Sequence, residues 1–524
     1  MFVETHVRPI RDARWPRVHA RLVRAILVVS LLLAGRPVFA QSDFAAIDAE
    51  VKAAVARGEI PSAAYAVSRN GRVVHAGAFG YADRERHVRA SVRTAYPLAS
   101  LTKPITATAL LVLQQRNGFS LDTPVYDLLP DHPRPRAQTD SRLREVTLAR
   151  LLHHTAGLGT YARIYYGDDI AHAPTFPASL DDYSEPVQTP GIAAEYSNLG
   201  YGLLGDVIAE QSHTTFADYA RRHVFVPLRM RDAFIAEGRE HRERRGAQGY
   251  DAEMKPLPPL WNDTPGAGNA YASVDDLLRF GWFHLAPTAA RNSASKLHLS
   301  AAAVAAMRER DADRARHAMY GNAWYGQGWY VRDLPKPLIW HEGGMPGAST
   351  LLALYPSCAT VVTVLVNRTD AQTFVQSLAG KLVERTCRAA PPLALDPVSG
   401  FAPLTGNSAF TGEWQGSLRV DGQARAVHLS IDAAGNGRIT YAPAPGETEV
   451  AREFHAIVSD GSLISAVQGP WQSHDAPNGA AALLIKFVRA SENTLEGALV
   501  AYDGPQRLRF LLPYPVTLRR IDTH

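Results

Sequence analysis

A serine and a lysine three residues apart, Ser100 and Lys103, have the types and spacing that could do chemistry. They lie in the stretch 97–104, which reads Pro-Leu-Ala-Ser-Leu-Thr-Lys-Pro and runs into an apolar segment from Ile105 to Leu113. If that segment is a helix starting at Ser100, Lys103 lies one turn later on the same face, where its amine can reach the serine hydroxyl. A hydroxyl beside an amine is a nucleophile beside a base.

The four-letter pattern alone says little, because Ser-x-x-Lys arises by chance about once or twice in a chain of this length. A second copy runs from Ser293 to Lys296, in a polar stretch where no apolar helix starts. We predict that this copy lies in a loop leading to a helix around Ala301 to Met307. Its context therefore favours Ser100 as the nucleophile.

The composition bounds the class of protein. The chain has 524 residues, 46% of them hydrophobic and 20% charged, which is typical of a globular protein with more than one domain. The formal net charge of +4 is small for this length, and much of the excess arginine lies near the N-terminus. We expect no nucleic-acid partner.

The first forty residues resemble a secretory signal peptide. An apolar run from Ala25 to Gly35 precedes Val38-Phe39-Ala40, which carries small residues at the cleavage-type positions. The arginines that precede the run are Arg8, Arg11, Arg14, Arg17, Arg21 and Arg24. An uncleaved membrane anchor is the alternative, but the run is roughly half of the ~20 residues that a span needs. We predict cleavage between Ala40 and Gln41, a periplasmic or secreted protein, and no transmembrane span after cleavage.

The elements that must position Ser100 and Lys103 alternate between helices and strands. A helix over Phe44 to Val55 precedes strands 63–67 and 73–78, which Asn70-Gly71 joins as a tight hairpin. Further helices are predicted over 147–153, 203–211 and 374–383, and further strands over 338–341, 350–355 and 360–366. This order predicts an α+β domain with an antiparallel sheet, in which the last helix packs against the first.

The C-terminal part has a different pattern. Residues 388–403 are rich in proline and alanine, and short alternating runs separated by turn signals follow. That spacing predicts a small all-β barrel. The predicted strands include 412–420, 427–431, 438–441, 454–458, 483–488, 495–502 and 508–512. We divide the chain into a signal peptide (1–40), a catalytic domain (42–388), a linker (389–405) and a barrel (406–524).

The residues that often bind metals or form disulfides are few. Export would permit a disulfide between Cys358 and Cys387, the two cysteines of the chain, but the sequence leaves their pairing open. Neither has a neighbouring ligand at metal-site spacing, and the adjacent His153 and His154 point in different directions on a helix. We predict no metal and no cofactor.

Three motifs in order carry a resemblance to a known family. Ser100-Leu101-Thr102-Lys103, Tyr196-Ser197-Asn198 and His341-Glu342-Gly343 resemble the motifs of the serine β-lactamase and penicillin-binding-protein superfamily. The supporting phrases at 151–158, 200–205 and 325–329 are similar to its class C branch, which includes AmpC-type β-lactamases, D-aminopeptidases and family VIII carboxylesterases. The resemblance covers about 42–387 and implies a β-lactamase/transpeptidase-like fold, an antiparallel sheet flanked by helices with a helical subdomain. The C-terminal part resembles, more weakly, an appended lipocalin-like barrel.

The resemblance also implies roles. Ser100 would form an acyl-enzyme, and Lys103 would take its proton if burial and like charge lower its pKa from about 10.4. Tyr196 would be the partner base that activates the deacylating water, and Asn198 would bind Lys103 or the substrate amide. The oxyanion would lie between the backbone N–H groups of Ser100 and Gly344, directly after the third motif at Gly343.

His341 departs from the family pattern, which usually has lysine there to attract a substrate carboxylate. Because histidine has a pKa near 6.5 and is mostly neutral at pH 7, the departure favours an esterase or aminopeptidase-like hydrolase of small ester, amide or peptide substrates. An acidic neighbour such as Glu342 could still charge His341. Two alternatives stay open: a penicillin-recognising sensor that acylates with little turnover, and a binding protein whose barrel carries the function.

Overall fold

The computed structural model describes residues 42–131, 140–174, 176–236, 246–293, 296–310, 318–319, 323–332, 336–388, 390–391, 393, 401–406, 408–476, 478–504 and 508–521. The predicted signal peptide lies outside this set, as does most of the predicted linker. Residues Ile47–His524 form one compact unit and Met1–Ala46 another. The proposed boundary between catalytic domain and barrel therefore stays a prediction.

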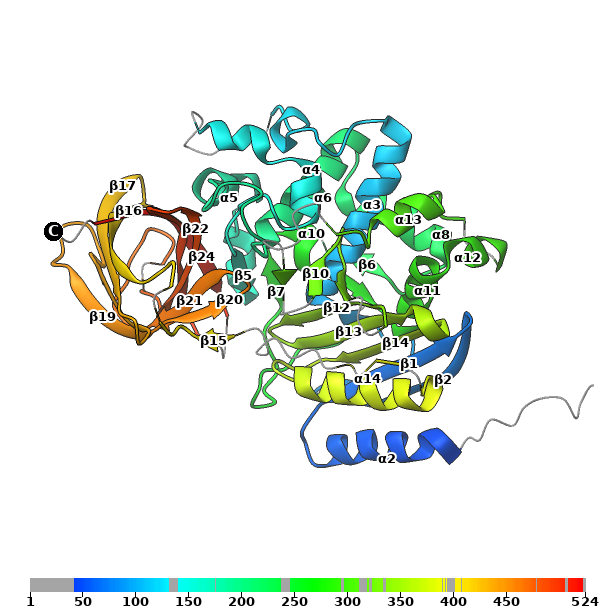
Figure 1. Cartoon of the computed structure of the whole chain (residues 1–524). Helices are drawn as coiled ribbons and strands as arrows, with labels where there is room; N and C mark the ends of the chain where they lie inside the picture. The colour runs from blue at the N-terminus through cyan, green and yellow to red at the C-terminus, as the bar shows by residue number, and fades with distance from the viewer. Residues whose placement is uncertain are drawn as a thin grey trace, which may run out of the picture. The chain divides into compact units, whose positions relative to one another are not determined.

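An antiparallel nine-stranded sheet forms the base of the first part of the chain, as Figure 1 shows. Its order is β3 (Val88–Arg89), β2 (Arg72–Asp83), β1 (Ser62–Arg69), β14 (Thr360–Val366), β13 (Ala348–Tyr355), β12 (Leu338–Met345), β11 (Tyr330–Arg332), β10 (Ala323–Tyr325) and β9 (Ala318–Met319). The predicted hairpin is present, because Asn70 (φ 52°) and Gly71 (φ 72°) take the left-handed conformations that a two-residue turn needs. The sheet thus places β1, near the start of this part of the chain, beside β14, near its end.

Helices cover both faces of the sheet. Helix α11 (Val274–Leu285) lies on one face, where Gly281 packs against side chains of β13 and β14, and α14 (Gln372–Thr386) lies on the other (Figure 1). Helix α2 (Ser42–Ala56) carries Glu50, whose carboxylate forms an ion pair with Lys381 of α14 at 2.5 Å. The predicted α+β arrangement, in which the last helix contacts the first, is confirmed.

A helical region lies over the sheet around α3 (Thr102–Asn117), which is buried from Thr102 to Leu113. Helices α6 (Asn198–Ser212) and α10 (Pro265–Gly268) pack against α3. Their backbones come close: a Cβ on Gly266 would lie 2.2 Å from the carbonyl oxygen of Tyr201. A small sheet beside them consists of β4 (Tyr96–Pro97), β8 (Ala270–Ala272) and β6 (Phe234–Ile235).

Shorter helices complete this part. They are α4 (Leu148–Leu152), α5 (Phe176–Tyr183), α7 (Phe216–Ala220), α8 (Val226–Leu228), α12 (Pro287–Ser293) and α13 (Ala301–Ala306), with the short turns η2 (Val125–Asp127), η3 (Ser141–Glu145), η4 (Gly167–His172), η5 (Arg221–Phe225) and η6 (Pro356–Cys358). Among the described residues, no helix is both long and apolar enough to cross a membrane.

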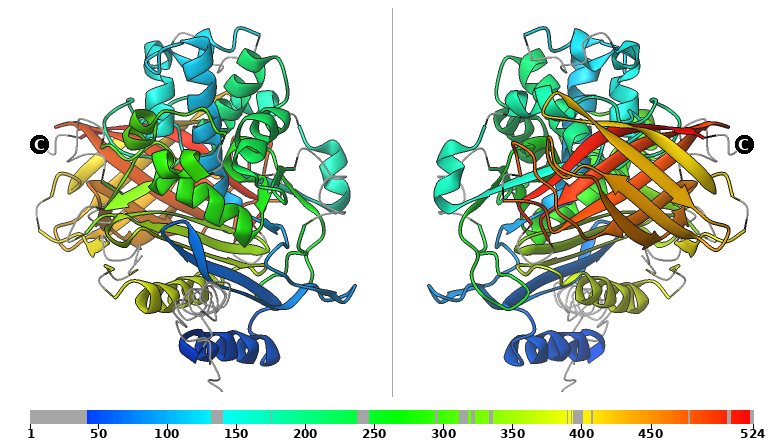
Figure 2. Two further views of the ribbon diagram at one scale, coloured as in Figure 1. Left: turned by 90° about the vertical axis from the view of Figure 1, so that its right-hand side faces the viewer. Right: turned by 90° about the vertical axis from the view of Figure 1, so that its left-hand side faces the viewer.

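The C-terminal strands form a nearly closed antiparallel barrel, seen from two sides in Figure 2. The order is β15 (Ala402–Pro403), β20 (Ile457–Ser459), β21 (Ser462–Val467), β22 (Ala482–Ser491), β23 (Thr494–Tyr502), β24 (Phe510–Arg520), β16 (Gly412–Val420), β17 (Gln423–Ile431), β18 (Asn436–Tyr441) and β19 (Val450–His455). Buried Val427, Leu429 and Ile431 alternate with more exposed residues along β17, as an inward-facing strand requires. The predicted barrel is confirmed, and β21 is a strand that the sequence prediction did not name.

The barrel is hydrogen-bonded to the first part of the chain. Strand β24 pairs with β5 (Ala162–Tyr166), with Phe510 opposite Arg163, and β5 pairs in turn with β7 (Leu260–Asn262). Sheet hydrogen bonding therefore continues from the barrel into the part that carries Ser100.

Several local predictions need correction. Ser293 is the last residue of α12 and not part of a loop, although the two residues after it lie outside the described set. Helix α6 begins at Asn198, five residues before the predicted start, because Ser197 caps it. Strand β12 continues to Met345, beyond the predicted end at His341. Cys358 and Cys387, whose pairing the sequence left open, form a disulfide.

Candidate active site

Ser100 lies in the turn η1 (Ala99–Leu101) that leads directly into α3. Ala99 has φ 48°, an uncommon left-handed conformation for a residue with a side chain. The hydroxyl of Thr350 donates to the carbonyl of Leu98 at 3.0 Å, and the hydroxyl of Thr102 donates to the carbonyl of Ala99 at 2.7 Å. These bonds hold the strained turn and fix the position of Ser100, an arrangement common at functional sites.

Lys103 lies one turn after Ser100 and is fully buried. Its Nζ donates to Asn198 Oδ1 at 2.7 Å and to the carbonyl oxygen of Ala267 at 3.2 Å, and it lies 3.1 Å from Ser100 Oγ. Burial lowers the pKa of Lys103 well below its usual value. The sequence prediction also named like charge as a cause, but burial alone accounts for the shift. A neutral amine at this distance can accept the proton of Ser100.

Asn198 is fixed at the start of α6. The hydroxyl oxygen of Ser197, the preceding residue, accepts from the backbone N–H of Gly200 at 3.1 Å and so caps the helix. The Asn198 Nδ2 donates to the carbonyl of Tyr161 at 2.7 Å, which leaves Oδ1 directed at Lys103. The amide therefore presents its acceptor to the lysine.

Tyr196 lies beside the lysine, with Lys103 Nζ 4.6 Å from the centroid of its ring. Its ring packs against that of His154 with centroids 4.4 Å apart. His154 also holds the residues on either side of Tyr196: its Nδ1 accepts from the N–H of Ser197 at 3.2 Å, and its carbonyl accepts from the N–H of Glu195 at 2.7 Å. The tyrosine is thus fixed through its neighbours.

His154 is a site residue that the sequence reasoning missed. It is buried, and burial lowers its pKa well below 6.5, so the ring is neutral. Because Nδ1 accepts a hydrogen bond, the proton of the neutral ring lies on Nε2. The phrase at 151–158, which is similar to the class C branch, contains His154 and is the sequence signal for this role. The prediction treated His153 and His154 only as possible metal ligands.

His341 is buried beneath the site and paired with Tyr325. Its Nδ1 lies 2.7 Å from the carbonyl oxygen of Glu342, so Nδ1 carries the proton, and Nε2 accepts from the hydroxyl of Tyr325 at 2.8 Å. Burial lowers the pKa of His341 to about 3. The Glu342 carboxylate is held by α14, where Oε2 accepts from Gln372 and Gln376 at 2.7 and 3.0 Å, whereas the contact of Glu342 with His341 is through its backbone carbonyl. At neutral pH His341 is therefore an uncharged residue.

Strand β12 runs along the Ser100 turn at its two glycines. A Cβ on Gly343 would lie 2.1 Å from the carbonyl oxygen of Leu98, so only glycine permits this approach. Gly344 is exposed, and a Cβ there would meet nothing within 4 Å. Strand β12 is thus tightly packed against the Ser100 turn at Gly343 and exposed at Gly344.

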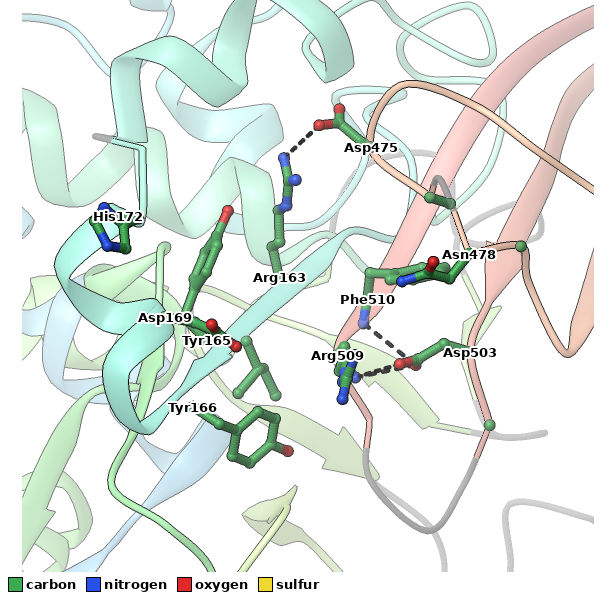
Figure 3. A pocket seen from close by; sticks show the side chains of 14 residues that line it. Arg163, Tyr165, Tyr166, Asp169, His172, Asp475, Asn478, Asp503, Arg509 and Phe510 are labelled. Carbon is green, nitrogen blue, oxygen red and sulfur yellow. Dashed lines mark hydrogen bonds and ion pairs between the residues drawn. The ribbon is translucent and has the colours of Figure 1, made fainter.

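Two cavities lie along the segments 155–190 and 251–271. One, of about 460 Å³, lies beside the end of β12, where Met345 to Gly347 face Leu257 to Leu260 and Tyr271. The other, of about 760 Å³, is lined by β5 and by residues of the barrel, and Figure 3 shows on its wall the ion pair of Arg163 with Asp475, whose charged groups lie 2.8 Å apart. Both segments therefore line open space.

The described part of the chain offers no metal-binding cluster. Within it, no group of three or more His, Cys, Asp or Glu side chains could hold a metal ion. His154 instead packs among tyrosine rings, with Tyr325 on its other side at 4.4 Å.

Comparison with known proteins places this geometry in a family. The chain is 26% identical to Protein flp of Staphylococcus aureus (strain MW2) over 345 residues, which are 61% of this chain and 62% of that protein. It is 27% identical to Penicillin-binding protein 4 of Amycolatopsis lactamdurans over 364 residues, which are 66% of this chain and 92% of that protein. The chain thus spans less than two thirds of the length of Protein flp.

A solved structure extends the likeness to the barrel. The crystal structure of SurE matches 92% of this chain and 99% of its own with a TM-score of 0.61 and 22% sequence identity, which is a likeness of fold. The Beta-lactamase family model matches residues 47–384, most of the chain and all of the residues described above around Ser100. The chain belongs to the beta-lactamase family, and its first part has the β-lactamase/transpeptidase-like fold.

Proposed function

We propose that the protein is a serine hydrolase that cleaves small ester or amide substrates through an acyl-enzyme on Ser100. The observation that carries the proposal is the buried amine of Lys103, 3.1 Å from Ser100 Oγ. A buried lysine with a lowered pKa is a base at neutral pH, and a serine beside a base is an activated nucleophile.

The proton path follows from the contacts of the lysine. Neutral Lys103 takes the proton of Ser100 as Oγ attacks the acyl carbonyl, and Asn198 Oδ1 and the Ala267 carbonyl stabilise the ammonium that forms. Tyr196, beside the same amine, passes a proton to the leaving group and activates the deacylating water. As the tetrahedral intermediate breaks down, the proton of the lysine replaces the one that Tyr196 gives to the leaving group, so that both residues end in their neutral forms.

The oxyanion is bound by two backbone N–H groups, that of Ser100 and that of Gly344. The fixed turn at Ala99 and the close approach of Gly343 to Leu98 support this assignment, because together they hold the two segments at one place. Backbone donors held in position before the reaction stabilise a developing oxyanion without reorganisation.

The neutral His341 favours uncharged substrates. A family member with lysine at this position has a fixed positive charge for a carboxylate, whereas here Tyr325 and Glu342 hold a neutral imidazole. We therefore favour a carboxylesterase, or a hydrolase of amides such as D-amino-acid amides, over a β-lactamase or a peptidase that recognises a free carboxylate.

Export is part of the proposal. The basic and apolar residues before Ala40 support a secretory signal, and the disulfide of Cys358 with Cys387 fits an oxidising compartment such as the periplasm or the medium.

The test compares the mature protein with Ser100→Ala and Ser293→Ala. Each is incubated with a short p-nitrophenyl ester, a chromogenic cephalosporin and a fluorescent acyl-serine probe. We expect turnover of the ester that Ser100→Ala abolishes and Ser293→Ala retains. Loss of labelling only in Ser293→Ala would show that the nucleophile is wrong, and no labelling of the wild-type protein would refute the acyl-enzyme.

A second candidate is a penicillin-recognising protein that acylates with little turnover. It is favoured by the relative from Amycolatopsis lactamdurans, which is a penicillin-binding protein and aligns with this chain over 92% of its own length. Stoichiometric labelling of Ser100 by a fluorescent penicillin, without turnover of esters or amides, would support this candidate and contradict the hydrolase.

A further inference from the structure

The barrel reaches the residue next to Tyr196 through one ion pair. Lys486 lies on β22, and its Nζ is 2.5 Å from Oε2 of Glu195. The side chain of Glu195 is 5% exposed and that of Lys486 27%. Because a buried carboxylate depends strongly on its counter-charge, removing the lysine would leave an uncompensated charge directly before Tyr196.

The second oxygen of Glu195 is tied to the backbone of Tyr196. The Thr160 hydroxyl lies 2.8 Å from Glu195 Oε1 and 3.0 Å from the carbonyl oxygen of Tyr196, so it is shared between the two acceptors. A carboxylate that rotates changes this sharing and with it the hydrogen bond that the Tyr196 carbonyl accepts. The position of the Tyr196 backbone is therefore coupled to Lys486.

Further contacts hold β23, which pairs with β22 in the barrel, against residues 187–189 of the segment that precedes Glu195. Val187 packs with Ala498 and Val500, in β23. The backbone N–H of Thr189 donates to Glu496 Oε2 at 2.6 Å. These contacts fix β23, the strand that pairs with β22, against the segment that leads to Tyr196, so Lys486 is held where it meets Glu195.

We infer that Lys486 of the barrel is a positioning residue for Tyr196, acting through the buried carboxylate of Glu195. The inference rests on the proposed function, because Tyr196 is given a catalytic role there. It gives the barrel a part in the reaction: the hydrolytic site reaches its working geometry only when the barrel supplies this lysine.

The experiment uses the full mature chain and matched variants. Lys486→Met keeps the length of the side chain and removes its charge, and Lys486→Arg keeps the charge. Arg419→Met is the matched control, because Arg419 also lies on the barrel and forms an ion pair across to Glu185 at 3.3 Å, which does not involve Glu195 or Tyr196. Ester turnover gives kcat and KM, and spectra of ¹³C-labelled tyrosine, assigned with Tyr196→Phe, report on Tyr196 without any substrate.

We expect Lys486→Met to lower kcat by about 10- to 100-fold with little change in KM, because a small displacement of a reacting group has an effect of this size. Lys486→Arg keeps most of the kcat, and Arg419→Met behaves as wild type. The Tyr196 resonance moves in Lys486→Met and not in Arg419→Met. If Lys486→Met folds poorly, the double variant Glu195→Gln/Lys486→Met removes both charges, and the same loss of kcat is expected because the link to Tyr196 stays broken.

Two results would overturn the inference: a kcat of Lys486→Met, or of the double variant, equal to that of Arg419→Met, or a Tyr196 resonance that does not move when Lys486 is replaced. A wild-type protein that neither turns over esters nor labels at Ser100 would refute the proposed function instead, while the tyrosine spectra would still decide whether Lys486 positions Tyr196.

Discussion

Tyr325 donates its hydroxyl hydrogen to Nε2 of His341 across 2.8 Å, at the position where the family usually carries a lysine. The imidazole is buried and its other nitrogen donates to the Glu342 carbonyl, so both ring nitrogens are satisfied by the protein. A neutral hydrogen-bonded pair thus takes the place of a fixed positive charge.

Replacing Tyr325 by phenylalanine should destabilise the fold. His341 Nε2 would be left buried without its donor, and an unsatisfied buried polar atom costs about 1–3 kcal/mol of unfolding free energy. Tyr355→Phe is the control, because the buried Tyr355 hydroxyl finds no hydrogen-bond partner among the described residues. Urea unfolding should show a loss for the first variant and little change for the second; equal effects would argue against the Tyr325 bond.

Lys103→Arg should abolish turnover although it keeps a positive charge. Arginine cannot release its proton in a protein, so it cannot act as the base for Ser100. Loss of a positioned base typically lowers the rate about 10²- to 10⁴-fold. The measurement is the pre-steady-state rate of acylation by a p-nitrophenyl ester. Substantial activity in Lys103→Arg would mean that another group takes the proton of Ser100.

Asn198→Asp should move the pH profile to higher pH. It puts a carboxylate about where Oδ1 now lies, 2.7 Å from Lys103 Nζ. An opposite charge this close favours the protonated lysine and raises its pKa by about 1–3 units. Because the free amine is the active form, the acid limb of kcat/KM should shift upward by the same amount. Asn198→Ala lacks the charge and should not shift the limb upward.

Much of the fold was predictable because the signals were local. The Asn70-Gly71 hairpin follows from two residues that accept positive φ, and the barrel follows from alternating runs whose buried faces the structure confirms. Strand β12 was predicted too short because Gly343 and Gly344 read as a loop. The role of Gly343 in the strand depends on the close approach of Leu98, which lies more than 240 residues away in the chain.

The site was only partly predictable for the same reason. Ser100, Lys103 and Asn198 share one hydrogen-bond cluster, and their motifs could be found from spacing. The contact between Lys486 and Glu195 carries no sequence signal, because a lysine on an alternating strand resembles any exposed residue. The pairing of Tyr325 with His341 likewise appears only when β10, β11 and β12 come side by side.

The adjacent glycines of β12 offer a matched pair of substitutions. In Gly343→Ala the new Cβ would lie 2.1 Å from the Leu98 carbonyl and 2.4 Å from Thr350 Oγ1, so the Ser100 turn must shift. In Gly344→Ala the methyl meets open space and the backbone N–H is kept. We expect Gly343→Ala to lose most activity and to unfold at lower temperature, while Gly344→Ala keeps the stability of the wild type. A Gly343→Ala protein with normal activity would show that the close approach is not needed.

Asp263 is a buried acid that is connected to Asn198 through Tyr161. Asp263 Oδ2 accepts from the hydroxyls of Tyr161 and Ser179, the latter at 3.0 Å, and the carbonyl of Tyr161 accepts from Asn198. Burial raises the pKa of Asp263 to about 7, against the opposing effect of these hydrogen bonds. Oδ1 meets no partner among the described residues, so it is the oxygen that carries the proton.

Asp263→Asn should therefore change how stability depends on pH. The pKa of Asp263 is about 7 in the folded protein, against an ordinary value of 3.8. Between these values the folded state holds a proton that the unfolded chain releases. The contribution of Asp263 to the unfolding free energy of the wild type therefore falls as pH rises from about 4 to 7. Asparagine is neutral throughout and escapes this loss. Relative to wild type, the unfolding free energy of the variant should rise by roughly 3 to 4 kcal/mol over that window, at about 1.4 kcal/mol per unit of pKa, and level off above pH 7. Urea unfolding of both proteins at pH 4.5, 6 and 8 measures the difference. A constant difference across these pH values would mean that Asp263 is ionised in the folded protein.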